Sequence, residues 1–160
     1  MTSLESRLAH LAHQSVHLQR RFFRALSDDP PATVDEEWAV AHLSMGERDL
    51  WHQMQNQDKR HCLEVARRFV TFAPAAPRFA IAAALMHDVG KVQSRLGTFA
   101  RVTATLVGPR TKRFRLYHDH ERIGADLLRA AGSAPETVAL VGETSDQRIM
   151  AAALHRADDI

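Results

Sequence analysis

His87 and Asp88 stand at the end of an unbroken apolar run, residues 79–86, which predicts a buried helix. A carboxylate at the mouth of such a helix is costly unless something compensates its charge. A divalent cation does so, because imidazole nitrogen and carboxylate oxygen together suit zinc, manganese, iron or magnesium. The dipeptide alone is more often structural, so the metal interpretation depends on further ligands elsewhere in the chain.

Two more ionisable residues have matching positions. His61 lies 26 residues before His87, on the margin between the polar and apolar faces of a predicted helix. Asp158 lies 70 residues after Asp88 and follows the apolar run AAAL. Three predicted helices therefore each carry a potential ligand beside an apolar face, and a helical bundle can bring such groups to one ion.

Two residues close in sequence to these candidate ligands, Cys62 and His155, lead to further expectations. Cys62 follows His61, but a helix turns about 100° per residue, so we expect its side chain to be buried and to point away from the site. His155 precedes Asp158 by three residues and shares its helix face, so we expect it to support the ligands.

The elements that must position these residues are helices in nearly every segment. Capping boxes at Ser44–Glu47 and Ser133–Glu136 predict two helix starts. The segment 91–107 is left open, since RVTATLV at 101–107 fits a strand or a helix. We predict an all-α bundle of about seven or eight helices, with helices over 3–26, from Thr33 or Asp35, from Ser44, over 58–72, 79–87 and 120–130, after Ser133, and over 146–159.

Four blocks of the sequence resemble the HD-domain metal-dependent phosphohydrolases. The family's H…HD…D pattern is matched by His61, His87-Asp88 and Asp158. The segments AAALMHDVGK, HERIGADLL and ADDI are similar to its AALLHDIGK, HPEIGAELL and terminal AD elements. The resemblance covers residues 44–160, so we expect an N-terminal helical extension over 1–43 and one compact HD domain over 44–160.

The resemblance implies that a divalent metal lies at the centre of the bundle. Its ligands would be His61, His87, Asp88 and Asp158, with Asp159 replacing Asp158 if the register shifts by one. Such ligands accept several ions, so manganese, magnesium, zinc, iron, cobalt and nickel all stay open.

One segment departs from the family's pattern. His120 matches the first of the extra histidines that hold a second ion in relatives with two metals. The residues 140–145, LVGETS, contain no histidine where those relatives have I-x-x-H-H. Glu143 could still bind a metal, but the departure favours a mononuclear site and leaves a loss of activity open. The GYP element of relatives that cleave cyclic-di-GMP is also absent.

A phosphohydrolase mechanism gives roles to further residues. The metal would activate water for attack at phosphorus, and Asp88 would take part in catalysis as its ligand. His118 and His120 could pass a proton to the leaving group. Lys91 stands where relatives contact phosphate, and three basic residues are expected to meet the phosphate charge: Lys91, Arg95 and Arg115.

Composition narrows the class of protein. A chain of 160 residues suggests one domain, and its single cysteine rules out an internal disulfide. The apolar run 79–86 is too short to span a bilayer, and the charged N-terminus lacks a signal peptide, so we expect a cytoplasmic protein without a membrane partner. Between Asp88 and Asp119 there are seven basic and no acidic residues, which attracts anions. Few aromatic residues accompany them, so nucleic acid is not the expected partner.

The expected function is therefore hydrolysis of a phosphate ester, as a phosphomonoesterase or phosphodiesterase, with a nucleotide or related phosphorylated small molecule as substrate. The alternative is a non-catalytic HD module that binds a nucleotide or a protein partner. The predicted helix over 3–26 has a longer apolar stripe than one bundle face needs, so a homodimer through this helix also stays open.

Overall fold

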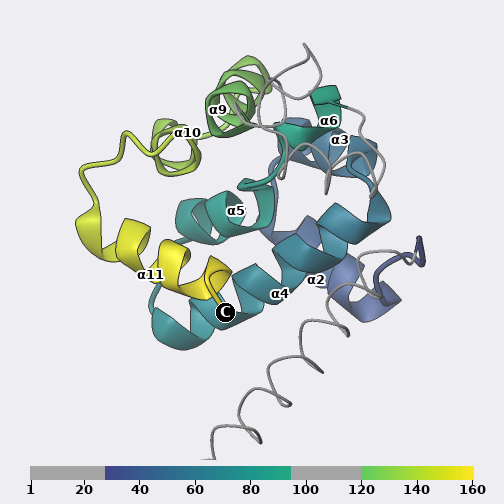
Figure 1. The fold of residues 1–160 in the computed structure, drawn as a ribbon, viewed down its shortest axis with the longest axis horizontal. Coiled ribbons are helices and arrows are strands. Elements are labelled where there is room, and N and C mark those ends of the chain that lie inside the picture. Colours follow the sequence, from purple (N-terminus) through teal and green to yellow (C-terminus); the bar gives the residue numbers. More distant parts are fainter. Residues whose placement is uncertain (1–27, 95–119) are drawn as a thin grey trace, which may run out of the picture.

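The computed structural model describes residues 28–94 and 120–160, and all regular structure there is helical. This confirms the predicted all-α class. The predicted helix over 3–26 and the segment RVTATLV lie outside the described residues. The helices are α2 (Thr33–His42), α3 (Met45–Gln53), α4 (Asn56–Phe72), α5 (Arg78–Met86), α6 (Lys91–Ser94), α9 (His120–Ala130), α10 (Pro135–Val141) and α11 (Arg148–Asp158) (Figure 1).

Helix α5 is the central element of the bundle. Six of its nine residues are buried, four of them alanines, so neighbouring helices can approach it closely. It packs against α4 on one side and α10 on another, while α11 packs along α4 (Figure 1). The prediction of a buried central helix from the apolar run 79–86 is confirmed, and its C-terminal end is where His87 and Asp88 follow.

The two predicted capping boxes have different outcomes. At α3 the box is present, since the backbone N–H of Ser44 donates to the Glu47 carboxylate at 2.7 Å and the N–H of Glu47 donates to the Ser44 hydroxyl at 3.4 Å. The box at Ser133–Glu136 is wrong. Helix α10 begins at Pro135 with Ala134 as its N-cap, because proline has no N–H to satisfy and its fixed φ suits a first helical turn.

Two glycines allow α9 to approach the turn that follows α5. A Cβ atom at Gly90 would clash with the backbone carbonyl of His120 at the start of α9. A Cβ at Gly124 would lie 3.3 Å from the backbone nitrogen of Gly90. The absence of both side chains therefore brings His120 beside the turn that carries His87 and Asp88.

Helix α2 belongs to the same core as the later helices. Ala39 and Leu43 are fully buried within it. The guanidinium of Arg78, at the start of α5, donates to the backbone carbonyls of His42 and Leu43 at 3.0 Å each. The proposed division at residue 43 stays a prediction, and across it the helices share one packed interior. No helix in the described ranges has the length and apolar character needed to cross a membrane.

Candidate metal centre

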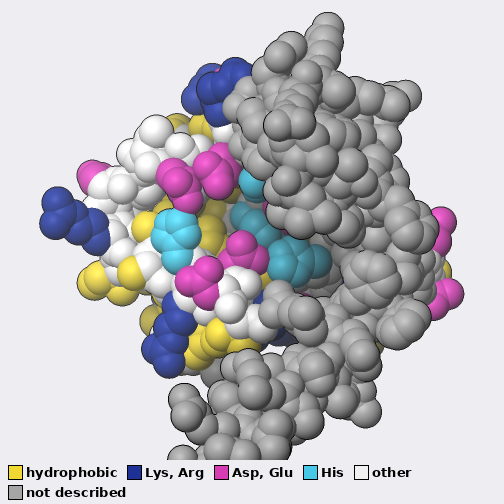
Figure 2. All heavy atoms as spheres, in the orientation of Figure 1, with side chains coloured by type: hydrophobic (Ala, Val, Ile, Leu, Met, Phe, Trp, Pro, Cys, Tyr) yellow, Lys and Arg dark blue, Asp and Glu magenta, His cyan; other side chains and the backbone are white. Residues whose placement is uncertain are grey.

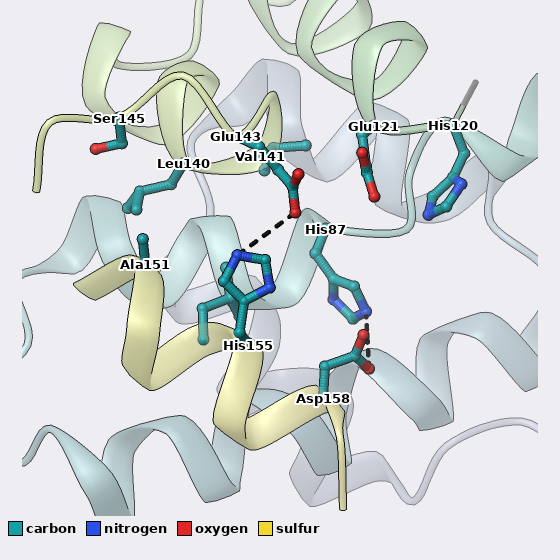
Figure 3. Close-up of a pocket in the computed structure, with 11 residues that line it drawn as sticks. His87, His120, Glu121, Leu140, Val141, Glu143, Ser145, Ala151, His155 and Asp158 are labelled. Carbon is teal, nitrogen blue, oxygen red and sulfur yellow. Dashed lines mark ion pairs between the residues drawn. The ribbon is translucent and has the colours of Figure 1, made fainter. Parts of the chain in front are cut away.

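The four residues of the predicted ligand set meet at one point of the fold. His61 comes from the second turn of α4, His87 and Asp88 from the turn after α5, and Asp158 from the last turn of α11. The Nε2 atoms of His61 and His87 lie 2.9 and 3.6 Å from Asp158 Oδ1. The same atoms lie 3.9 and 3.8 Å from Asp88 Oδ2. Figure 3 shows the His87 ring, from the turn after α5, facing the Asp158 carboxylate at the end of α11.

These residues fit a divalent metal ion. His61, His87 and Asp88 each offer one donor atom, and these three atoms lie within 4.8 Å of one another. Asp158 borders the same group. His87 Nδ1 lies 3.0 Å from the Ala84 carbonyl, which only accepts, so Nδ1 carries the proton and Nε2 presents its lone pair. That Nε2 atom is buried and has no hydrogen-bond partner in the described structure. A metal ion would satisfy it, and a backbone carbonyl on the other nitrogen is the usual support of a metal-binding histidine.

The electrostatics of the cluster keep its carboxylates ionised. Burial alone would raise the pKa of Asp88, but the charges of His87, Lys91 and His61 outweigh it and hold that pKa below its usual range. The His61 ring, 2.9 Å away, and the nearby His87 ring likewise hold the pKa of Asp158 below its usual range. Ionised carboxylates are the form that a cation requires.

The pKa of His87 is shifted in the opposite direction. Burial opposes a charge on its ring, while Cys62, Asp88 and Asp158 favour one, and the net effect raises the pKa of His87 well above its ordinary value. The charges that favour a proton on this ring would also favour a metal ion beside it.

Two more polar side chains approach Asp88, which is only 3% exposed. The Lys91 ammonium donates to Asp88 Oδ2, from the first turn of α6. His120 Nε2 lies 3.5 Å from Asp88 Oδ1, from the first residue of α9. Both were candidates for catalysis, and the structure brings both to the carboxylate of Asp88. Three other candidates, Arg95, Arg115 and His118, lie outside the described residues.

Cys62 differs in part from expectation. Its side chain is fully buried, as predicted, and burial raises the pKa of its thiol. The expectation that it points away from the site is wrong, because the thiol lies close enough to the His87 ring for each group to shift the pKa of the other. The turn after α5 reaches over the side of α4, so two consecutive α4 residues, His61 and Cys62, both contact this turn.

A pocket opens beside the cluster with a volume of about 240 Å³. His155 lines it as well as Glu143, and His155 Nε2 lies 3.4 Å from Glu143 Oε1. Figure 2 shows histidine and acidic side chains gathered on this face of the molecule. The pocket is lined by side chains from the turn after α5, from α9, α10 and α11, and from the loop between the last two: His87, His120, Glu121, Leu140, Val141, Glu143, Ser145, Ala151, Leu154, His155 and Asp158 (Figure 3).

Sequence reasoning missed two of these polar residues, Glu121 and Ser145. Glu121 directly follows His120, which was the only available signal, and nothing marked Ser145. The fallback ligand Asp159 caps α11 and is exposed, and it is Asp158 that meets the two histidines.

Comparison with known proteins agrees with this geometry. The family model described as the HD domain matches residues 59–159, a range that begins two residues before His61 and ends just after Asp158. No curated protein and no solved structure matches the chain. The matched range covers more than half of the 160 residues and contains the whole cluster, so the chain belongs to the HD domain family.

Proposed function

We propose that this protein is a metal-dependent phosphohydrolase that cleaves a phosphate ester of a nucleotide or related small molecule. The observation that carries the proposal is the convergence of His61, His87, Asp88 and Asp158 around the buried, unpartnered Nε2 atom of His87. Membership of the HD domain family supports it, because metal-dependent phosphohydrolases are typical of that family.

When bound, the metal supplies positive charge that activates water and polarises a phosphoryl oxygen. The protein's part is to hold the site in place. The Ala84 carbonyl orients the His87 ring, and Lys91 and His120 hold the Asp88 carboxylate from two directions. Asp88 is thereby fixed in an almost water-free position, where its charge acts strongly on anything bound beside it.

We assign the acid–base work to His120 and His118, and the phosphate contacts to Lys91, Arg95 and Arg115. His120 supports this assignment best, because it lines both the cluster and the pocket beside it. From there a protonated ring could donate to the oxygen of the departing alcohol. Lys91 would share its charge between Asp88 and a phosphate oxygen.

One observation favours a second candidate, a non-catalytic module that binds a phosphorylated ligand. The pocket wall at 140–145 presents Glu143 where relatives with two metals have a histidine pair. A chain that has lost the second ion could retain the pocket and lose turnover.

The deciding experiment measures metal and turnover together. We expect the purified protein to contain about one divalent ion per chain and to hydrolyse at least one phosphoester from a generic and nucleotide panel with manganese, cobalt or magnesium. Asp88→Ala should abolish both, whereas Asp49→Ala, on the exposed face of α3, should change neither. Full metal occupancy in Asp88→Ala would contradict the ligand assignment. Metal binding without turnover of any substrate above a His87→Ala control would favour the binding module.

A further inference from the structure

The pocket beside the metal cluster has a second polar end that the proposed chemistry does not use. Glu143 and His155 pair across it at 3.4 Å, and Glu121 lines it from the first turn of α9. In Figure 3 His87 and Asp158 lie at one side of the space, and Leu140, Ala151 and Ser145 lie at the other. A ligand with its phosphate at the metal cluster would therefore extend towards the Glu143–His155 pair.

The backbone conformation of Glu143 is energetically unfavourable for a residue that carries a side chain. Glu143 has φ of 55° and is the only non-glycine residue in the described ranges with a positive φ. It follows the C-terminus of α10, where glycine is the usual occupant of this conformation. The available glycine, Gly142, is one position earlier, where a Cβ would lie 3.0 Å from the Cβ of Ala125. Gly142 therefore stands where the end of α10 packs against α9, and Glu143 stands where the chain lines the pocket.

The chemistry of the lining selects the ligand. The carboxylates of Glu121 and Glu143 only accept hydrogen bonds, so they suit hydroxyl or amino groups and repel a second phosphate. Leu140, Ala151 and Leu154 add an apolar wall that suits a carbon frame. The volume of about 240 Å³ falls below the range of roughly 300–1,000 Å³ typical of pockets for drug-sized ligands. The buried Nε2 atom of His87 also lacks a partner beside this space, as expected if a metal ion and the phosphate that it holds lie at the near end of the pocket.

We propose that this pocket binds the alcohol part of the substrate, and that the preferred substrates are small phosphomonoesters of polyols or amino alcohols rather than polyphosphates. This inference rests on the proposed function. In the reaction, water oxygen forms a bond to phosphorus and the ester P–O bond breaks. The leaving alcohol oxygen takes up one proton, and water has released its own. Glu143, His155 and Glu121 hold the donor groups of that alcohol.

The test compares three small phosphate esters, which differ mainly in their donor groups, with an inorganic polyphosphate. Glycerol 3-phosphate and phosphoethanolamine carry donors, propyl phosphate has none, and tripolyphosphate carries extra negative charge. We expect kcat/KM in the wild type to favour the first two over propyl phosphate by about tenfold or more, the effect of a hydrogen bond to a charged group. Glu143→Gln should reduce that preference about tenfold, most strongly for phosphoethanolamine if charge dominates, and Glu121→Gln should reduce it less. Glu136→Gln, an exposed glutamate on the same helix as the pocket wall, should leave the preference unchanged.

A binding measurement separates this inference from the proposed function. If no ester is hydrolysed, the proposed function fails, but calorimetry on the metal-loaded protein still tests the pocket. Tighter binding of glycerol 3-phosphate than of propyl phosphate, with the difference lost in Glu143→Gln, supports it. The inference would be overturned if Glu143→Gln weakened the binding of every ester equally, or if it left the preference for glycerol 3-phosphate over propyl phosphate unchanged. A second metal ion that disappears in Glu143→Gln would overturn it as well, because the residues would then be ligands.

Discussion

The two ends of the pocket are built in different ways. The metal cluster is fixed by packed helices, since His61, His87 and Asp158 sit on or beside the buried faces of α4, α5 and α11. The alcohol end depends on Glu143 in a loop, where the backbone is held in an unfavourable conformation and the side chain is exposed. Helix packing therefore positions the candidate metal centre, while local loop geometry determines the lining of the pocket next to it. Changes at the two ends should differ in size and kind.

The largest effect is expected from the packing that supports the cluster. Gly90→Ala would place a methyl group on the His120 carbonyl, and backbone cannot move aside as a flexible side chain can. We expect the free energy of unfolding to fall by about 3 kcal/mol, at the upper end of overpacking effects, as measured by urea denaturation.

Gly132→Ala is the matched control for this substitution. Gly132 has a positive φ of 74°, but a Cβ there would meet no atom within 4 Å. Only its backbone cost of about 1 kcal/mol should appear. Equal losses from the two variants would contradict the close approach of α9 to the turn after α5.

The next largest effect should distinguish the adjacent residues Asp158 and Asp159 by their contributions to metal affinity. Asp158→Asn should weaken metal binding at least tenfold, because Asp158 faces both histidines and an amide is a poorer ligand than a carboxylate. Asp159→Asn should leave the affinity unchanged. Competition with a fluorescent chelator measures both values. The reverse ranking would show that the ligand register is shifted by one residue.

A smaller effect should appear in acid. The pKa of Asp88 is depressed in the folded chain, so its contribution to stability is present above the unfolded pKa and is lost as the pH falls through and below about 4. In metal-free protein, the stability difference between wild type and Asp88→Asn should therefore narrow between pH values of about 5 and 3, by about 1–2 kcal/mol. Asp49→Asn, at an exposed site, should show a difference that does not change with pH. A constant difference for Asp88→Asn as well would contradict the electrostatic account of the cluster.

The smallest effect should come from the alcohol end, and it should be a gain. Glu143→Gly relieves the positive φ, so we expect the unfolding free energy to rise by about 0.5–1 kcal/mol, with the entropy of glycine in the unfolded chain offsetting part of the relief. Thermal denaturation of metal-free protein measures it. A clear loss of stability would show that the Glu143–His155 pair is worth more than the backbone costs.

The sequence predicted the metal end of the pocket better than the alcohol end, for physical reasons. Apolar periodicity marks the faces that helices bury. It therefore predicted α4, α5 and α11, together with the candidate ligands at the margins of their apolar faces. The contact between Cys62 and His87 depends on how one segment crosses another, which no spacing along a single helix reveals. The positive φ of Glu143 depends on where α10 ends, and the neighbouring Gly142 is the residue type that this conformation usually favours. The wrong capping box at Ser133 has a similar cause, because Pro135 can start a helix without a side-chain cap.

X-ray absorption spectroscopy of the metal-loaded protein tests the central claim most directly. The account predicts one ion bound by two imidazole rings, with oxygen atoms as its remaining ligands. His61→Ala should reduce the imidazole signal to one ring, whereas His52→Ala, an exposed histidine on α3, should leave two. A spectrum without imidazole scattering, or one that His61→Ala does not alter, would contradict the assignment of this cluster as the metal centre.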